Sequence, residues 1–274
     1  ELTIRDVLVI NVDGELDKVG RVRLRVCDGG GRDVDVIDSR RLAAADGITT
    51  VVATPHIVEG VYSGMDIDQR IAEIRAGFKH EGINVALATG AEVSMSHCLE
   101  ADVETLKKLT IGDGDFILVE TSGTTPAQLS DVVERIGMYG FYSVLAHPER
   151  TLYTVNEIGR LCAGAKDRNV FLQVTAASIE GLFGRKIQKK CMYLIKSGLV
   201  HFVATDAHSD FGRVPVMSNA YNILSQKAAG AADLLMQENP RRLLENKKPQ
   251  STGSGEMRSG KRMFFRNSGS GMGA

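Results

Sequence analysis

Short runs of β-branched and aliphatic residues alternate along the chain with longer segments in which apolar residues recur every three or four positions. The runs have the length and composition of buried strands. They are either Val7–Ile10 or Val22–Val26, followed by Thr50–Ala53, Val85–Ala88, Phe116–Val119, Ser143–Ala146, Val170–Val174 and His201–Ala204. Strands that alternate with helices predict a parallel sheet.

The segments between these runs have the spacing of amphipathic helices. Their apolar sets are Ile67/Ile71/Ile74/Phe78, Leu129/Val132/Val133/Ile136, Ile158/Leu161/Ala165 and Ile187/Cys191/Leu194/Ile195. The glycines that should end helices before the next strand are Gly47, Gly82, Gly140 and Gly198. About seven such units can close a barrel. We therefore predict an α/β fold of the βα-barrel type, with an open doubly wound sheet as the alternative.

Composition divides the chain into three parts. Residues 33–248 carry the strand–helix units and are long enough for one large domain. Residues 1–32 are rich in Val, Asp, Arg and Gly, and we expect this atypical segment to complete the barrel. Residues 249–274, which follow a short helix predicted at Arg241–Glu245, are rich in Gly and Ser and predict a disordered tail.

The net charge excludes some classes of partner. The 274 residues carry a formal net charge of −1, so no global field recruits nucleic acid or an anionic membrane. Aromatic residues make up 5% of the chain and Trp is absent, which removes the usual platform for stacking bases. A phosphorylated substrate would therefore be recognised by a local cluster of charges.

Cysteine usage and hydropathy predict the compartment. The four cysteines, Cys27, Cys98, Cys162 and Cys191, are far apart and form no CxxC pair, as expected in a reducing cytosol. The N-terminus lacks a signal-peptide pattern, and no apolar run approaches the roughly 20 residues that cross a bilayer. We expect a cytoplasmic protein without membrane insertion; the sequence leaves its oligomeric state open.

Most predicted strands lead directly into a side chain that can bind a metal ion. These side chains are His56, Glu92, Glu120, His147, Asp206 and His208. The carboxyl ends of the strands converge on one mouth of a βα barrel, where catalytic groups are found. Carboxylates mixed with imidazoles suit Mn, Fe or Zn. Two such ions about 3.5–4 Å apart can polarise a phosphoryl oxygen and generate hydroxide near neutral pH.

Each of these residues alone has an ordinary structural interpretation. A His after a strand is usually a satisfied polar residue, Asp206 could cap a helix, and Glu92 and Glu120 could form salt bridges. Their coincidence at five strand ends favours a metal site. Arg150 and Arg213 follow two of the ligand motifs, and a guanidinium group matches two phosphate oxygens at once.

A cysteine-based mechanism is the competing interpretation. Cys162 and Arg168 have the C-x5-R spacing of cysteine-dependent tyrosine phosphatases, in which a loop holds phosphate against a thiolate of low pKa. Here the motif lies inside a predicted amphipathic helix, Asn156 to Arg168. No His precedes the Cys and no Ser or Thr follows the Arg. This pattern is typical of a chance match.

The motifs Thr-Pro-His (54–56), Gly-Ala-Glu (90–92), Leu-Val-Glu (118–120), Leu-Ala-His-Pro-Glu-Arg (145–150) and Thr-Asp-Ala-His (205–208), in this order, resemble the PHP (polymerase and histidinol phosphatase) family. The similarity covers roughly residues 33–245. Within the family it is greatest to the bacterial manganese-dependent protein-tyrosine phosphatases of capsule and exopolysaccharide clusters. Gln173–Lys189 and the Arg213…Asn219-Ala220-Tyr221 stretch look like that branch.

The resemblance implies a distorted seven-stranded βα barrel with up to three divalent ions. The ligands it implies are Asp28, His56, Glu92, Glu120, His147, Asp206 and His208, with Glu92 bridging. It implies that Arg150 and Arg213 hold the phosphate, and we expect them to act in catalysis together with His56. The implied substrate is phosphotyrosine on an autophosphorylating bacterial tyrosine kinase.

The chain departs from the family pattern at its start. The family opens with a His-x-His pair before an Asp-Asp-Gly turn, and Asp28-Gly29 matches the end of that turn. The pair would then fall on Val19 and Arg21, which cannot replace imidazole ligands, and no His precedes His56. Asp13-Gly14 offers a second register. Either the N-terminal segment is rearranged relative to its relatives or the protein works with fewer ions.

Three functions follow from these observations. The first is a metal-dependent phosphotyrosine phosphatase. The second keeps the same site but acts on a small molecule such as histidinol phosphate or a nucleotide. The third is a metal-impaired relative that binds phosphotyrosine without hydrolysing it. Metal content and activity on p-nitrophenyl phosphate with and without Mn would separate them.

Overall fold

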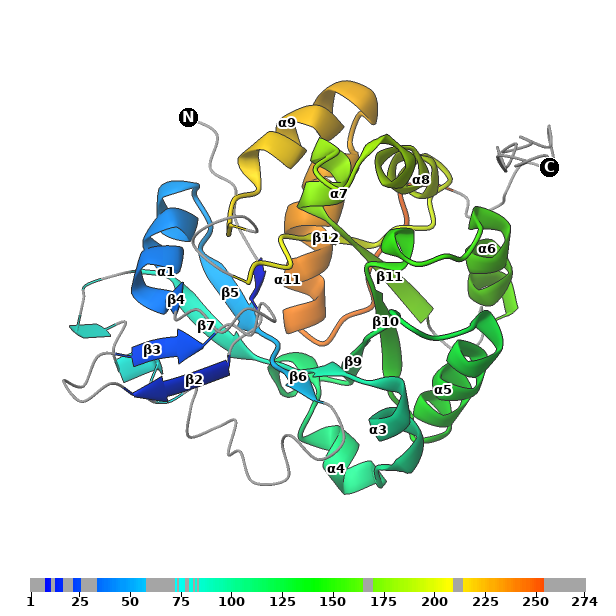
Figure 1. The fold of residues 1–274 in the computed structure, drawn as a ribbon, viewed down its shortest axis with the longest axis horizontal. Coiled ribbons are helices and arrows are strands. Elements are labelled where there is room, and N and C mark those ends of the chain that lie inside the picture. The colour runs from blue at the N-terminus through cyan, green and yellow to red at the C-terminus, as the bar shows by residue number, and fades with distance from the viewer. Residues whose placement is uncertain are drawn as a thin grey trace, which may run out of the picture.

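The computed structural model describes residues 8–10, 13–16, 22–25, 34–57, 72, 74–76, 79–80, 82, 84–164, 170–208 and 214–253. These residues form a mixed α/β structure built on parallel sheets, with helices packed around them (Figure 1). One parallel sheet has the order β1 (Leu8–Ile10), β5 (Thr50–Ala53), β7 (Ala86–Thr89). The second has the order β12 (Phe202–Ala204), β11 (Val170–Thr175), β10 (Tyr142–Ala146), β9 (Phe116–Val119), β8 (Glu92–Val93), β6 (His56–Ile57).

The helices between the strands follow the predicted alternation. They are α1 (Val36–Ala45), α3 (Met95–Glu100), α4 (Val103–Lys107), η1 (Ile111–Asp113), α5 (Pro126–Met138), η2 (Pro148–Arg150), α6 (Val155–Gly164), α7 (Ala176–Glu180), α8 (Arg185–Lys196), α9 (Ser218–Lys227), α10 (Ala231–Asp233), η3 (Leu234–Glu238) and α11 (Asn239–Leu244). The four predicted glycine stops all have positive φ, from 65° to 87°. None of the helices in the described ranges is long and apolar enough to cross a membrane.

The N-terminal region contains an element that the sequence did not predict. Of the two candidates for the first strand, Leu8–Ile10 pairs in parallel with β5. Val22–Arg25 instead forms β3 in a small antiparallel sheet with β2 (Asp13–Leu16) and β4 (Val34–Asp35). This sheet was missed because its strands carry charged residues at many positions. Val19, Arg21 and Asp28 lie outside the described residues.

Two of the parallel strands are interrupted, and His56 and Glu92 lie directly after the interruptions. Thr54 and Pro55 separate β5 from β6, and Gly90 and Ala91 separate β7 from β8. At Gly90 a side chain would crowd the neighbouring strand, because a Cβ atom there would lie 3.1 Å from Thr54 Cγ2. After the interruption β6 and β8 pair within the second sheet, with His56 opposite Glu92. Pairing of β1 with β12, which would close a barrel, is not found among the described residues.

The core lies on both faces of the second sheet. All four residues of β9 are buried, as expected for a parallel strand covered on both sides. Phe116 and Leu118 belong to one apolar cluster with Phe171 and Phe202, whereas Ile117 and Val119 belong to a larger cluster that includes the buried face of α5. The alternation follows from the two-residue period of a strand.

The C-terminal segment holds the amino ends of the strands. The Asn239 side chain donates to the carbonyl oxygens of His201 and Gln250, both at 2.8 Å, and accepts from the backbone N–H of Gln250 at 2.7 Å. Asn246 accepts from the backbone N–H of Asp115 at 2.9 Å. His201 and Asp115 precede β12 and β9, so these contacts fasten two strand starts. Ser251 Oγ also donates to the Gly198 carbonyl, so packing continues past the expected boundary at residue 248.

Candidate metal centre

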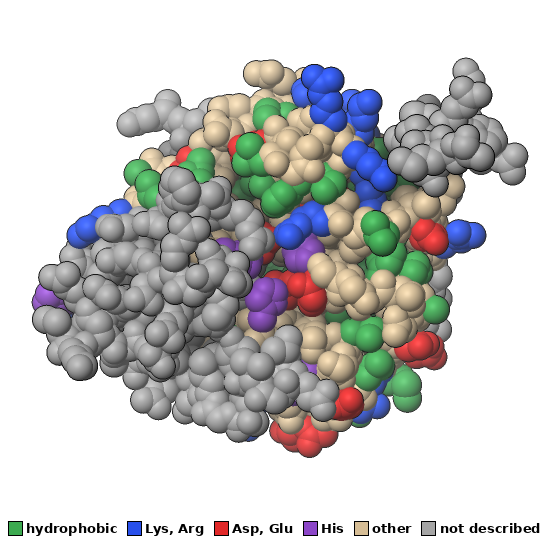
Figure 2. Space-filling model, viewed as in Figure 1, with side chains coloured by type: hydrophobic (Ala, Val, Ile, Leu, Met, Phe, Trp, Pro, Cys, Tyr) green, Lys and Arg blue, Asp and Glu red, His purple; other side chains and the backbone are tan. Residues whose placement is uncertain are grey.

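The predicted ligands gather at the carboxyl ends of the parallel strands. Figure 2 shows His and acidic side chains together in a recess, with basic side chains beside them. Each ligand follows a buried strand because the apolar run ends there and the chain emerges at the sheet edge. The structure therefore brings six of the predicted side chains close together: His56, Glu92, Glu120, His147, Asp206 and His208.

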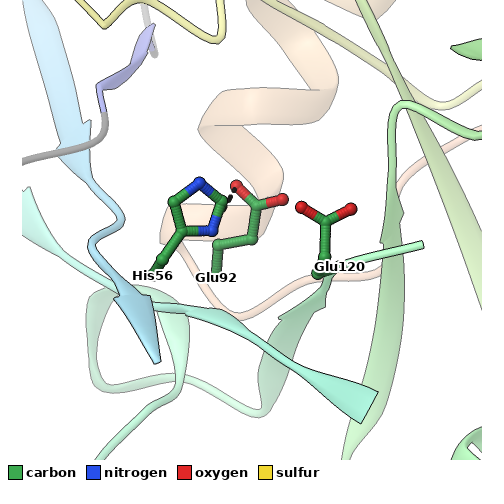
Figure 3. A group of neighbouring side chains, drawn as sticks. All are labelled: His56, Glu92 and Glu120. Atoms are coloured by element: carbon green, nitrogen blue, oxygen red, sulfur yellow. Dashed lines mark ion pairs between the residues drawn. The ribbon is translucent and has the colours of Figure 1, made fainter. Parts of the chain in front are cut away.

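One donor group combines His56, Glu92 and Glu120, from β6, from β8 and from the end of β9. Each offers a ligand atom, and these atoms lie within 4.8 Å of one another. Figure 3 shows the three side chains directed toward a common space. His56 Nδ1 lies 3.9 Å from Glu92 Oε2. The His56 side chain is 34% exposed, so the group opens to solvent on the His56 side.

A second donor group combines Glu92, His147 and Asp206, all of them buried, again within 4.8 Å. His147 Nε2 lies 3.1 Å from Glu92 Oε1 and 3.7 Å from Glu120 Oε1. The two groups share Glu92, which is 2% exposed. Glu92 is therefore placed where one carboxylate could bridge two ions.

The backbone at two of the predicted ligands is strained. His147 has φ 36° and Asp206 has φ 51°, a left-handed conformation that residues other than glycine adopt at a cost. In the described ranges only four non-glycine residues have positive φ, and the other two are Asp113 and Asn246. Strain of this kind concentrates at functional sites, where the surrounding structure holds it.

The electrostatics of the centre are set by burial and by the carboxylates that surround the His147 ring. Burial raises the pKa of Glu92, although a hydrogen bond to His147 opposes this. For Glu120, burial is outweighed by His147 and by the Ser122 N–H, which together lower its pKa to about 2. Burial would lower the pKa of His147, but Glu92, Glu120 and Asp206 raise it to about 9. Bringing three carboxylates around one imidazole is costly unless positive charge is supplied.

Arg150 lies at the edge of this centre. Its Nη1 donates to Asp206 Oδ2 at 2.6 Å, and its guanidinium carbon is 4.8 Å from the centre of the Phe183 ring. His208 is also close: its Nδ1 is 3.7 Å from Asp206 Oδ1, and its ring centre is 6.0 Å from that of His56. His208 is not part of either donor group. Arg213 and Asp28 lie outside the described residues.

Sequence reasoning missed a buried carboxylate next to these residues. Glu149 is 1% exposed, and its Oε1 accepts from the Thr175 N–H at 3.0 Å and from Ser178 Oγ at 2.7 Å. Lys190 Nζ donates to the carbonyl oxygens of Pro148 and Thr151. These contacts fix the short turn η2 that carries Arg150. The one sign of it in the sequence was its position between His147 and Arg150, both predicted site residues.

The cysteine-based alternative does not fit the structure. Cys162 lies in the last turns of α6, and burial raises the pKa of its thiol to about 12. A thiol of that pKa is protonated at neutral pH and is a poor nucleophile. The donor set of buried carboxylates and imidazoles instead fits borderline divalent ions such as Mn, Fe or Zn.

A family model for capsular polysaccharide synthesis, CpsB/CapC, matches residues 24–245. The chain belongs to the CpsB/CapC family. The match begins after Val19 and Arg21, so the segment that lacks the His pair precedes it. All five residues of the two donor groups lie within the CpsB/CapC match.

Relatives of known name support this membership. The chain is 28% identical over 222 residues to the tyrosine-protein phosphatase YwqE of Bacillus subtilis (strain 168), covering 80% of this chain and 87% of YwqE. It is 28% identical over 207 residues to the tyrosine-protein phosphatase CpsB of Streptococcus pneumoniae, covering 72% of this chain and 85% of CpsB.

Solved structures with a similar fold include a metal-dependent tyrosine phosphatase. A match with a TM-score of 0.70 and 26% identity, covering 79% of this chain and 90% of the other, comes from the crystal structures of YwqE from B. subtilis and CpsB from S. pneumoniae, which are unique metal-dependent tyrosine phosphatases. Dihydropyrimidinase from Brevibacillus agri NCHU1002 matches with a TM-score of 0.52 and 13% identity, over 90% of this chain and 72% of that chain. The second likeness concerns the fold alone.

Proposed function

We propose that this chain is a metal-dependent phosphatase that hydrolyses phosphotyrosine on protein and acts in capsule or exopolysaccharide synthesis. The observation that carries the proposal is Glu92, a buried carboxylate common to two donor groups beside Arg150. Relatives that are tyrosine-protein phosphatases, and membership of the CpsB/CapC family, support this substrate class.

Glu92, Glu120, His56, His147 and Asp206 would hold two divalent ions, which are Mn in this proposal and Fe or Zn as alternatives. When bound, such ions supply a hydroxide near neutral pH and balance the charge of the phosphate. The buried positions of Glu92, His147 and Asp206 would fix the geometry of the ligand atoms.

Arg150 and Arg213 are proposed to orient the phosphate. Arg150 is held between Asp206 and the Phe183 ring, and it offers donors that match two phosphate oxygens. His56, half-exposed at the rim, is proposed to act on the reacting groups as well. The phenol that leaves from phosphotyrosine has a pKa near 10 and needs less protonation than an alkyl alcohol.

We also propose that the two parallel sheets form one distorted seven-stranded barrel. In this arrangement β5 and β6 act as one strand and β7 and β8 as another, and β1 lies next to β12. The third ion of the PHP pattern is proposed to bind weakly, because the given sequence has no His before His56 to supply the imidazole pair. Asp28 and His208 are the residues proposed to remain at that position.

The proposed location is the cytoplasm, and the proposed partner is an autophosphorylating tyrosine kinase. Both proposals rest on the resemblance and on cysteine usage. An oligomer is compatible with them.

The test is hydrolysis of p-nitrophenyl phosphate by the full chain after EDTA treatment and after addition of Mn. We expect EDTA to abolish turnover and Mn to restore it, and Cys162→Ser to change it little. Activity that survives EDTA and is lost in Cys162→Ser would reject the metal-dependent mechanism.

Substrate specificity separates the remaining alternatives. The phosphatase proposal expects phosphotyrosine peptides to be hydrolysed faster than histidinol phosphate or a nucleotide. The missing His pair favours the metal-impaired form as a second candidate. In that form the protein would bind a phosphotyrosine peptide at a measurable Kd without turnover, and Val19→His with Arg21→His would raise metal content per chain.

A further inference from the structure

Helix α8 presents a strongly basic surface beside the metal centre. The helix carries five Lys or Arg residues and no acidic residue. Arg185, Lys186 and Lys189 are exposed. In the part of the chain that the structure describes, none of the three has an acidic partner within ion-pair distance. Figure 2 shows Lys and Arg side chains over α8 and toward the upper end of α9, above the recess that holds the His and acidic side chains.

The placement of these charges is unfavourable for the isolated fold. Arg185 and Lys186 lie in the first turn, where the positive end of the helix dipole disfavours cations. Arg185 and Lys189 are also four residues apart, a spacing at which like charges repel. Burial lowers the pKa of Lys190 to about 8, and the charge of Lys186 contributes to this. An anionic partner would relieve this repulsion.

The basic surface is connected to the phosphate-binding side of the centre. Phe183, whose ring contacts Arg150, is two residues before Arg185. Two residues span at most about 7.6 Å between Cα atoms. Lys190 fixes η2 from the other side through the carbonyl oxygens of Pro148 and Thr151. The exposed side chains of Leu152 and Leu182 lie in the loops that follow η2 and precede α8.

We propose that the surface formed by Arg185, Lys186 and Lys189 binds acidic residues that flank the phosphotyrosine of a protein substrate. This inference rests on the proposed function and narrows its substrate class. An extended peptide advances about 3.3 Å per residue, so Asp or Glu two to four residues from the phosphotyrosine would reach α8. The net charge of the whole chain is −1, so the attraction belongs to this surface and not to the molecule as a whole.

The test compares two phosphotyrosine peptides that differ only in their flanks, one with Asp and one with Lys at those positions. The Mn-loaded wild type should hydrolyse the Asp peptide with a kcat/KM about five- to tenfold higher, the size expected for two exposed ion pairs. The double variant Arg185→Glu with Lys189→Glu should prefer the Lys peptide. Both preferences should shrink as salt is raised, because exposed charges are screened.

A matched control has the same change of net charge elsewhere. Lys196→Glu with Lys227→Glu alters exposed lysines at the far end of α8 and at the end of α9. This control should keep the wild-type preference. If it loses the preference as the α8 variant does, the effect belongs to net charge and the inference is wrong. Should the α8 variant fail to fold, Arg185→Gln with Lys189→Gln must abolish the preference instead.

The two proposals fail in different ways. A wild type that hydrolyses p-nitrophenyl phosphate but treats both peptides alike would overturn the docking surface and leave the phosphatase intact. A wild type that hydrolyses nothing would overturn the proposed function, and peptide binding followed by fluorescence anisotropy would then test the same preference. If a single-stranded oligonucleotide binds through α8 while neither peptide is preferred, the surface serves nucleic acid and the inference is wrong.

Discussion

His147 and Asp206 show how single residues hold the centre in place. Both have a left-handed backbone, and both follow a buried strand whose hydrogen bonds fix the chain up to that point. Contacts of their side chains hold both residues in this conformation. Arg150 pairs with Asp206, and Glu92 accepts a hydrogen bond from His147. These contacts order the side chains of the proposed centre, and such preorganisation would lower the entropic cost of binding an ion there.

Because Glu92 belongs to both donor groups, its loss should affect two ions at once. We expect Glu92→Gln to retain less metal per chain after dialysis than Glu120→Gln, whose carboxylate belongs to one group. Mass spectrometry of the bound metal gives the comparison. Equal losses in the two variants would show that Glu92 serves a single ion.

Glu149 should matter for stability as much as for the site. Glu149→Ala leaves the Thr175 N–H and the Ser178 hydroxyl without their buried acceptor, which costs about 2–4 kcal/mol of unfolding free energy. Urea unfolding measures the loss. Glu149→Gln keeps one acceptor oxygen and should recover part of it, and the exposed Glu104→Ala should cost little. An unchanged urea midpoint in Glu149→Ala would contradict this account.

The difference between Glu92 and Glu149 shows what sequence could predict at this scale. Glu92 follows β7 after Gly90 and Ala91, and parallel strands direct their carboxyl ends to the same edge, so its position followed from chain order. Glu149 accepts from residues 26 and 29 positions away. Those contacts depend on the rotation of a short turn, which no periodicity encodes. The ion pair between Arg150 and Asp206 could not be predicted from the sequence for the same reason.

The parallel strands after residue 49 could be predicted at the scale of elements to within about a residue, because apolar runs and glycine stops determine them locally. The interruptions between β5 and β6 and between β7 and β8 could not. A short apolar run does not reveal where a strand leaves one sheet and joins another. That crossing depends on the close contact at Gly90 with Thr54, which appears only when the strands are paired.

The buried His201, which precedes β12, should make the stability of the protein depend on pH. Burial lowers its pKa from 6.5 to about 4, and its Nδ1 accepts from the Leu172 N–H. The unfolded chain binds the proton first as pH falls, so stability is lost between pH 6.5 and about 4 and is constant above that window. The shift corresponds to roughly 3 kcal/mol at most.

Urea unfolding of the EDTA-treated protein at pH 7.5 and pH 5 tests this dependence. His201→Gln keeps an acceptor for the Leu172 N–H and removes the titration, so the drop in stability between the two pH values should be smaller than in the wild type. The same drop in both proteins would mean that other groups cause it.

The molecule as a whole has two ends with different contacts. The carboxyl ends of the strands carry acidic, imidazole and basic side chains, and the amino ends are tied by the C-terminal segment. A division between the two ends of the strands is typical of βα barrels, in which one face carries the catalytic groups and the other contributes to stability. The contacts described for this chain follow that division.

Asn239→Ala should therefore reduce stability without changing metal binding at the other end of the strands. Asn239 is fully buried and makes three hydrogen bonds, to His201 and to Gln250. Their loss should lower the unfolding free energy by about 2–4 kcal/mol. Metal bound per chain, measured well below the melting temperature, should match the wild type. A reduced metal content in a fully folded variant would show that the two ends are coupled.

The distance between the ties at Asn239 and the ligands has a consequence for the history of the sequence. A chain that is fastened at one end can lose ligands at the other and still fold, so selection against misfolding does not protect the chemistry. Ligand positions at the strand ends are therefore open to substitution without loss of the fold, and metal binding by this chain could be altered by changes that leave Asn239 and its partners untouched.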